Sequence, residues 1–144
     1  MNAWATITAV RHTSASLQKR ADLLLHGRGL TLTQVEILMA VNDRRRTYAG
    51  RLARDVRITR QGARRHLLTL ERRGAATLLA PGDFTRDVEL TPAGAELLSA
   101  AFSDLGPLFA GLAQIVRGDL PTIPPLLAGV ENAARRPLTS AWGR

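Results

Sequence analysis

The 144-residue chain contains no cysteine. This excludes disulfides, thiolate zinc sites, cysteine nucleophiles and thiol-based sensing of oxidants within the chain. Aromatic residues make up only 4% of the sequence, and lysine occurs once, at Lys19, against nineteen arginines. A preference for arginine over lysine can reflect base composition alone, so it is given little weight.

Long apolar runs are also missing. The longest nearly uncharged one, "LGPLFAGLAQIV", has about a dozen residues, whereas a helix that crosses a bilayer needs roughly 18 to 20. The N-terminus "MNAWATITAV" has no basic residue before Arg11 and is too polar for the apolar stretch of a secretory signal. We therefore expect no membrane segment and a protein that stays in the cytoplasm.

Positive charge is concentrated in one window. Residues 44–73 contain eleven arginines against Asp55 and Glu71, a net charge of +9, while the remainder of the chain carries −1. A cluster of this kind is the electrostatic footprint of a protein that binds a polyanion. The alternative is a solvated basic face that keeps the protein soluble. The 45% hydrophobic content is that of an ordinary globular domain.

Apolar periodicity predicts four helices in the first half of the chain. An amphipathic helix is expected from Trp4 to Leu25, and a second from the capping box of Thr31 and Gln34 to about Asn42. A short third helix precedes a fourth, which Thr59 caps and Gly74 stops. The residues expected to face inward from the last three helices are Val35, Leu38, Met39 and Val41, then Leu52, Ala53 and Val56, then Ala63, Leu67 and Leu70.

The second half of the chain begins with a predicted β-hairpin. The β-prone runs "ATLLA" and "RDVEL" flank the turn-forming "PGD". Thr91 and Pro92 start a long apolar helix that Gly106 and Pro107 should kink or break. A final helix is expected from about Thr122 to Arg135. The outer helices carry more apolar surface than the middle module can cover, which predicts a second copy of the chain as partner; a monomer whose outer helices fold on each other is the alternative.

This ordered set of motifs resembles the MarR family of bacterial winged-helix transcription regulators. The resemblance covers about 65 residues, and its matched positions are Leu52 and Ala53, Thr59, Leu70, Glu71 and Gly74, and Leu90, Thr91 and Gly94. It implies a mainly α fold with a β-hairpin wing, in which a winged helix-turn-helix is flanked by dimerisation helices. The implied division is an N-terminal dimerisation helix (1–28), a DNA-binding module (29–90) and C-terminal dimerisation helices (91–144), all integrated in one domain.

The fourth helix is the predicted recognition helix. A helix turns by about 100° per residue, which places some residues on the side opposite the buried stripe. These outward residues are Arg60, Gln61, Arg64, Arg65 and Leu68. In the major groove, arginine can bond guanine and glutamine can bond adenine, so Arg60, Gln61 and Arg64 are candidates for base edges. Gly62 allows either close approach of the backbone to DNA or tight packing of the helix.

Phosphate contacts are expected around these base contacts. The resemblance implies one for Arg65, and Arg51, Arg54 and Arg57 either do likewise or solvate their helix. Thr59 belongs to the same candidate DNA-binding surface. Arg44, Arg45 and Arg46 are either solvated or bound, and Arg72 and Arg73 are expected to offset the dipole at the helix C-terminus. The wing is about two residues shorter than the family's, and the family's minor-groove contact transfers to Arg86.

A small aromatic or anionic effector is implied only by the resemblance. Trp4, Arg11, His12 and Arg20 could supply stacking and charge to its site, although the favoured interpretation places Trp4 in the dimer core and the other three on the surface. The histidines lack metal-ligand spacing, and neither a partnered serine nor a phosphate loop is present, so we expect no enzyme, metal or cofactor.

The sequence thus predicts a homodimeric regulator that binds double-stranded DNA sequence-specifically. We expect a repressor on a pseudo-palindromic site whose half-sites lie about 10 base pairs apart. The alternative is a winged-helix module that binds a protein or a small ligand and has lost specific DNA readout, which the short wing and Gly62 would suit.

Overall fold

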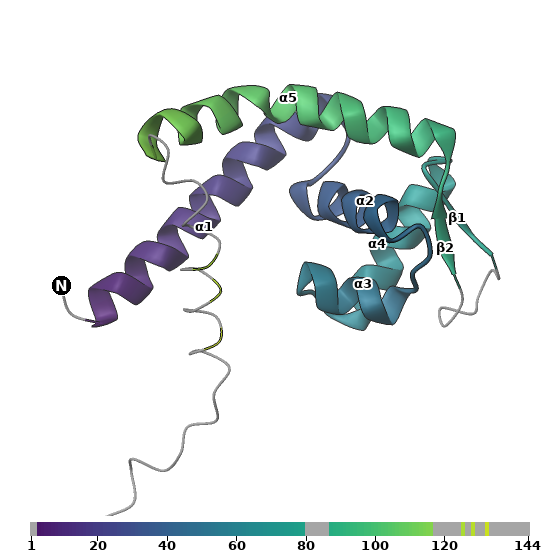
Figure 1. Ribbon diagram of the computed structural model, residues 1–144, viewed down its shortest axis with the longest axis horizontal. Coiled ribbons are helices and arrows are strands. Elements are labelled where there is room, and N and C mark those ends of the chain that lie inside the picture. Colours follow the sequence, from purple (N-terminus) through teal and green to yellow (C-terminus); the bar gives the residue numbers. More distant parts are fainter. Residues whose placement is uncertain (1–2, 80–86, 117–124, 126–127, 129–131, 133–144) are drawn as a thin grey trace, which may run out of the picture. The chain divides into compact units, whose positions relative to one another are not determined.

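The helices and strands follow the predicted order. The computed structural model describes residues 3–79 and 87–116, together with Pro125, Ala128 and Asn132. Its elements are α1 (Ala3–Leu25), a 3₁₀ turn η1 (His26–Arg28), α2 (Leu32–Arg44), α3 (Ala49–Val56), α4 (Arg60–Arg72), β1 (Ala76–Leu78), β2 (Val88–Leu90) and α5 (Pro92–Val116) (Figure 1). Residues up to Gly106 form one compact unit and those from Pro107 a second, so α5 runs from one into the other.

The start of α2 is fixed by side chains from two directions. Thr31 Oγ1 accepts from the backbone N–H of Gln34, and Gln34 Oε1 accepts from the N–H of Thr31, which confirms the predicted capping box. Asp22 of α1 accepts from the N–H of Leu32 at 2.7 Å. A carboxylate at a helix N-terminus also interacts favourably with the helix dipole.

The helix-turn-helix core is built from short apolar side chains. Ala49, Leu52 and Ala53 of α3 are buried, as are Ala63, Leu67 and Leu70 of α4. The predicted buried stripe of α4 is therefore confirmed residue for residue, whereas Val56 of α3 is only half-buried.

Gly74 ends α4 in a left-handed conformation with φ of +72°, which glycine adopts without steric penalty. Its N–H donates to Glu71 O at 2.8 Å, and the N–H of Ala75 donates to Leu70 O at 2.9 Å. This is the Schellman pattern, and it confirms the predicted stop.

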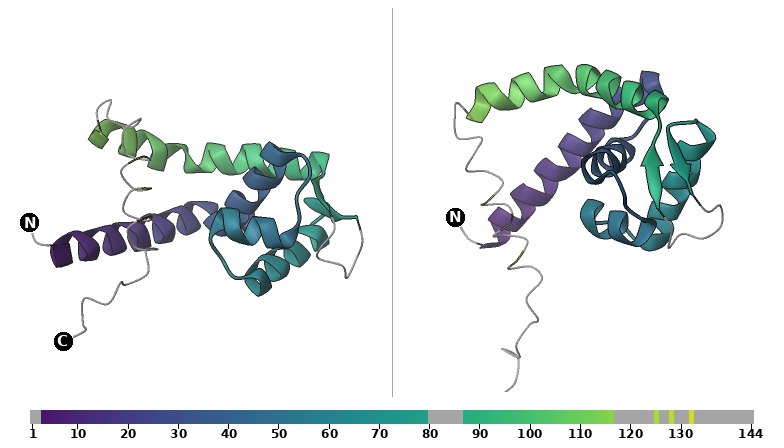
Figure 2. Two further views of the ribbon diagram at one scale, coloured as in Figure 1. Left: turned by 60° about the horizontal axis from the view of Figure 1, so that its bottom comes forward. Right: turned by 45° about the vertical axis from the view of Figure 1, so that its right-hand side comes forward.

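The hairpin pairs β1 and β2 antiparallel, with Ala76 opposite Leu90 and Leu78 opposite Val88. Thr47, just before α3, adds a bridge by accepting from the N–H of Val88 at 2.7 Å. Figure 2 shows the hairpin between the end of α4 and the start of α5. The tip of the predicted wing, residues 80–86, lies outside the described residues.

Thr91 and Gly94 connect the residues that follow α4 to α5. Thr91 Oγ1 donates to Gly74 O at 2.5 Å and accepts from the N–H of Gly94 at 2.9 Å. The N–H of Thr91 donates to Ala75 O at 3.2 Å. A Cβ on Gly94 would lie only 1.9 Å from that same carbonyl oxygen. The close approach explains glycine here, and the Thr91–Pro92 helix start is confirmed.

Four expectations need correction or stay open. Met39 is not buried. Its side chain is 40% exposed, because it lies about 100° beyond Leu38 on the side of α2 away from the buried residues Ile37 and Val41. Helix α2 continues to Arg44, two residues past Asn42, and α5 continues through Pro107 without a break. Of the predicted helix at 122–135, only Pro125, Ala128 and Asn132 are described, and these are helical.

No helix among the described residues has both the length and the apolarity to cross a bilayer.

Gly94→Ala should destabilise the protein by about 3 kcal/mol, because the added methyl group must displace the backbone of Ala75. Denaturant unfolding followed by circular dichroism measures this change. Gly106→Ala, in the same helix with open space around the position, is the control and should stabilise by about 0.5 to 1 kcal/mol. Equal stability of Gly94→Ala and the parent protein would contradict the close packing.

Candidate nucleic-acid interface

Helix α4 presents a basic face to solvent. Arg60, Gln61, Arg64 and Arg65 are all exposed, while Ala63, Leu67 and Leu70 on the opposite side are fully buried. Leu68, between the arginine turns and the end of the helix, is 40% exposed. Burial of one stripe thus fixes which side chains project outward. The structure brings the four predicted polar residues together on two successive turns.

Thr59 caps the N-terminus of this helix. Its Oγ1 accepts from the N–H of Gly62 at 3.0 Å, as predicted for the cap. A Cβ on residue 62 would lie 3.1 Å from that hydroxyl oxygen. The capping interaction therefore gives Gly62 a local packing reason, independent of any approach of DNA.

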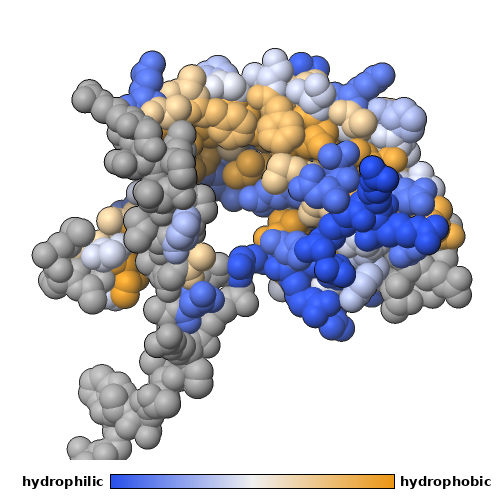
Figure 3. Space-filling model, viewed as in Figure 1, coloured by the Kyte–Doolittle hydropathy of each residue, from blue (hydrophilic) through white to orange (hydrophobic). Residues whose placement is uncertain are grey.

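Two exposed arginines lie on α3, and a third follows it in the turn before α4. Arg51, Arg54 and Arg57 are exposed, and Arg54 donates to the hydroxyl of Tyr48 at 3.1 Å. Arg57 occupies the turn between the two helices with φ of +60°, a left-handed conformation that is uncommon for residues other than glycine. Figure 3 shows hydrophilic side chains over α3 and apolar side chains along α5.

The three arginines at the end of α2 and just after it, residues 44–46, partly pair with carboxylates. Arg44 binds Asp55 through Nε at 2.7 Å and Nη2 at 3.1 Å, and Arg46 lies 3.7 Å from Asp87. Arg45 has φ of +58°. Arg44 thus has a partner at the end of α3, which weakens the case for a DNA contact from this residue.

At the other end of α4, Arg72 donates to Thr69 at 3.4 Å within the helix. Arg73 was expected to offset the dipole of its own helix, but the structure shows a different contact. Its guanidinium donates to two backbone carbonyls, Arg28 O at the end of η1 and Gly29 O just after it.

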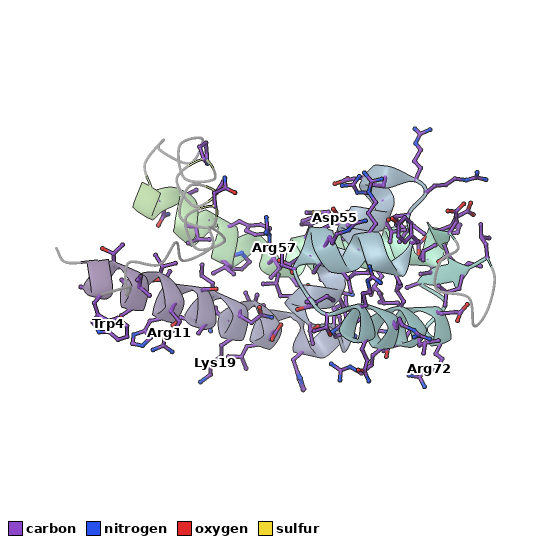
Figure 4. The ribbon with its side chains drawn as sticks, turned by 90° about the horizontal axis from the view of Figure 1, so that it is seen from below. Trp4, Arg11, Lys19, Asp55, Arg57 and Arg72 are labelled. Carbon is purple, nitrogen blue, oxygen red and sulfur yellow. The ribbon has the colours of Figure 1, made fainter. Side chains whose placement is uncertain are left out.

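The predicted effector residues lie along α1. Trp4 is 75% exposed, Arg20 is exposed, and Arg11 Nη2 lies 3.0 Å from Nε2 of the adjacent His12. Figure 4 shows Trp4 and Arg11 on the same side of the helix. Arg86, the predicted wing contact, lies outside the described residues.

A groove between α2 and α3 was not predicted from the sequence. It has a volume of about 640 Å³ and includes Glu36, Met39 and Asp43 from α2 and Arg54 and Val56 from α3. Burial raises the pKa of Glu36, and the charge of Asp22 raises it further. No sequence signal indicated this groove, because Met39 was expected to face inward with the buried residues of α2.

His66 is the one titratable residue of α4 with a resolved shift among the described residues. Burial lowers its pKa below the ordinary 6.5, and the charge of Arg65 lowers it further. The folded protein therefore favours neutral His66, while the unfolded chain takes up a proton near pH 6.5.

Stability should consequently fall as the pH drops from 7.5 to 5.5, and His66→Gln should lose less stability over this range than the parent protein. Unfolding free energies of both proteins at the two pH values measure the difference, in which the contributions of other titrating groups cancel. An identical loss in both proteins would show that His66 does not contribute.

Several solved structures of transcriptional regulators are similar to this chain. The M. tuberculosis transcriptional regulator MosR is 25% identical with a TM-score of 0.77 over 89% of this chain and 93% of its own. Its complex with DNA is 26% identical with a TM-score of 0.73 over 93% and 96%. The Streptomyces coelicolor MarR family regulator Sco5413 is 20% identical with a TM-score of 0.78 over 91% and 94%.

NadR in complex with 4-hydroxyphenylacetate is 20% identical, with a TM-score of 0.70 over 85% of this chain and 89% of its own. No protein-family model and no curated protein matches the sequence. The order of the elements, the hairpin after α4 and these structural similarities confirm the predicted fold: this chain has the winged-helix fold of the MarR family of transcriptional regulators.

Proposed function

We propose that the protein is a transcription regulator that binds double-stranded DNA sequence-specifically as a homodimer, and that it represses by occluding a promoter. The observation that carries this proposal is the exposed face of α4, where Arg60, Gln61, Arg64 and Arg65 stand opposite a fully buried stripe. A helix with such a face fits the major groove of B-DNA. The similarity to MosR in complex with DNA supports it.

The residues of this surface divide by role. Arg60, Gln61 and Arg64 read base edges, because they lie on the N-terminal turns that enter the groove first. Arg65, Arg51 and Arg57 contact phosphates, and Thr59 holds the start of the helix while lying at the same surface. The minor-groove contact is assigned to Arg86 on the family resemblance alone, because this residue lies outside the described ones.

Apolar side chains on α1 support the dimer. Trp4, Ile7 and Val10 are spaced by three residues and therefore share one side of the helix, and Ile7 is 57% exposed. A second copy that covers this side would remove its apolar surface from water. The two recognition helices would then enter successive major grooves about 34 Å apart, which requires a pseudo-palindromic site.

An effector would weaken DNA binding by favouring a dimer whose recognition helices are wrongly spaced. The complex of NadR with 4-hydroxyphenylacetate supports a small-molecule effector of this class. The α2–α3 groove suits such an effector better than the α1 residues do. The groove is a concave surface on the two helices that precede the recognition helix. The α1 residues are exposed; they are Trp4, Arg11, His12 and Arg20.

Arg64→Ala should weaken binding to the cognate duplex by about 1 to 3 kcal/mol and leave binding to random duplex nearly unchanged. Arg65→Ala should weaken binding to every duplex and reduce the salt slope by about one unit, because one phosphate contact is lost. Fluorescence anisotropy at two salt concentrations, with duplex from upstream of the protein's own gene and excess random competitor, measures both effects.

Equal losses on all sequences for both variants would mean that the assigned roles are wrong. If excess random duplex displaced the parent protein from the upstream duplex, that duplex would contain no specific binding site. If selection of duplexes from a random pool also yielded no specific site, the winged-helix module without specific DNA readout would be favoured.

Ile7→Glu should raise the dissociation constant of the dimer at least about a hundredfold, because two isoleucine side chains, each contributing about 1.5 to 3 kcal/mol on burial, are replaced by charges. Sedimentation equilibrium measures the constant. Ala9→Glu, on the opposite side of α1, is the control and should leave dimerisation intact. A monomer at all concentrations of the parent protein would contradict the dimer itself.

A further inference from the structure

Arg73 connects the C-terminal end of α4 to the turn that follows α1. Its Nη1 donates to Gly29 O and its Nη2 donates to Arg28 O, both at 2.6 Å. Hydrogen bonds from a charged donor are shorter and stronger than neutral ones. Both terminal nitrogens of one guanidinium are thus held by adjacent carbonyls, so the side chain cannot reorient without losing two bonds.

The same turn is bound to α5. Arg28 Nε lies 2.7 Å from Asp104 Oδ2, and its Nη2 donates to Oδ1 at 3.3 Å. The hydrogen bond from Arg28 lowers the pKa of Asp104, as expected for a carboxylate paired with a cation. Residue 28 therefore accepts from α4 through its backbone and donates to α5 through its side chain. Three segments far apart in the sequence are linked at one point.

The position of this link on α4 determines what it can do. Arg73 follows the last residue of the helix, and the thirteen residues from Arg60 to Arg72 give α4 a length of about 20 Å. A tilt of about 10° at the C-terminal end would move Arg60 by about 3 Å, which is the length of a hydrogen bond. Base contacts made by the N-terminal turns of α4 therefore depend on the tilt of the helix, which is set at its C-terminal end by Arg73.

We propose that Arg73 is a positioning residue for DNA recognition. Together with Arg28 and Asp104 it holds α4 at a fixed angle to the end of α1 and the middle of α5, and so sets the separation of the two recognition helices in the dimer. This inference rests on the proposed function for its effect on DNA. Exposed ion pairs contribute little to stability, so the effect falls on geometry rather than on folding.

The first test compares half-site spacings. Each variant is titrated with a selected cognate duplex and with the same duplex carrying one inserted base pair between the half-sites. The parent protein should prefer the native spacing by at least about tenfold, because one inserted base pair moves the half-sites about 3.4 Å further apart and rotates one relative to the other about the DNA axis. Arg73→Ala and Asp104→Asn should reduce this preference to about twofold or less and keep the parent salt slope. Arg72→Ala, whose bond lies within α4, should retain the preference.

A second test does not need DNA. The chain has no cysteine, so Leu68→Cys on α4 and Ser99→Cys on α5 place two spin labels at exposed sites without further substitutions. Labelled protein diluted with unlabelled protein reports the distance within one chain by double electron–electron resonance. The distance distribution should be narrow in the parent background, should broaden or shift with Arg73→Ala, and should stay narrow with Arg72→Ala.

The outcomes separate the possible roles of Arg73. Unchanged distance distributions with Arg73→Ala would overturn the proposal whether or not the protein binds DNA. If Arg73→Ala reduced the salt slope by about one unit but kept the full preference for the native spacing, Arg73 would be a phosphate contact. That result would also overturn the proposal. Broadened distances in a protein that lacks specific DNA binding would uphold the positioning of α4 and reject the proposed function. Thermal unfolding of each variant shows that the compared proteins are folded.

Discussion

The candidate nucleic-acid interface depends on one constraint, the burial of Ala63, Leu67 and Leu70 of α4. These three side chains are fully buried, and a helix repeats every 3.6 residues, so the rotation of α4 about its axis is fixed once they are packed. Arg60, Gln61, Arg64 and Arg65 then have only the solvent side available. The packing of the core therefore determines the direction in which the basic side chains project. A change that rotated α4 would disrupt both.

The residues that carry the family resemblance mostly hold this helix in place. Gly74 ends α4, and Thr91 and Gly94 bind the backbone that follows it. Glu71 Oε1 accepts from the N–H of Leu78, which ties the end of α4 to the hairpin. These positions orient α4, and none of them belongs to its exposed basic face. In the proposed function, base specificity comes from that exposed face.

Local signals explain how much could be predicted. The cap at Thr59, the stop at Gly74 and the buried stripe of α4 are each specified within a few neighbouring residues, and so is the start of α5 at Thr91. The α2–α3 groove and the pairing of Arg44 with Asp55 require two helices to be packed together. The link from Arg73 to Arg28 and on to Asp104 spans 45 and then 76 residues, so sequence periodicity carries no signal for it.

Methylation interference tests most directly whether α4 reads DNA in the major groove. A duplex selected by the protein from a random pool is methylated at guanine N7, an acceptor that arginine contacts only in the major groove. The account predicts that methylated guanines in two half-sites, about 10 base pairs apart, are excluded from the bound fraction. Binding that is insensitive to N7 methylation at every guanine would contradict a recognition helix whose arginines reach base edges.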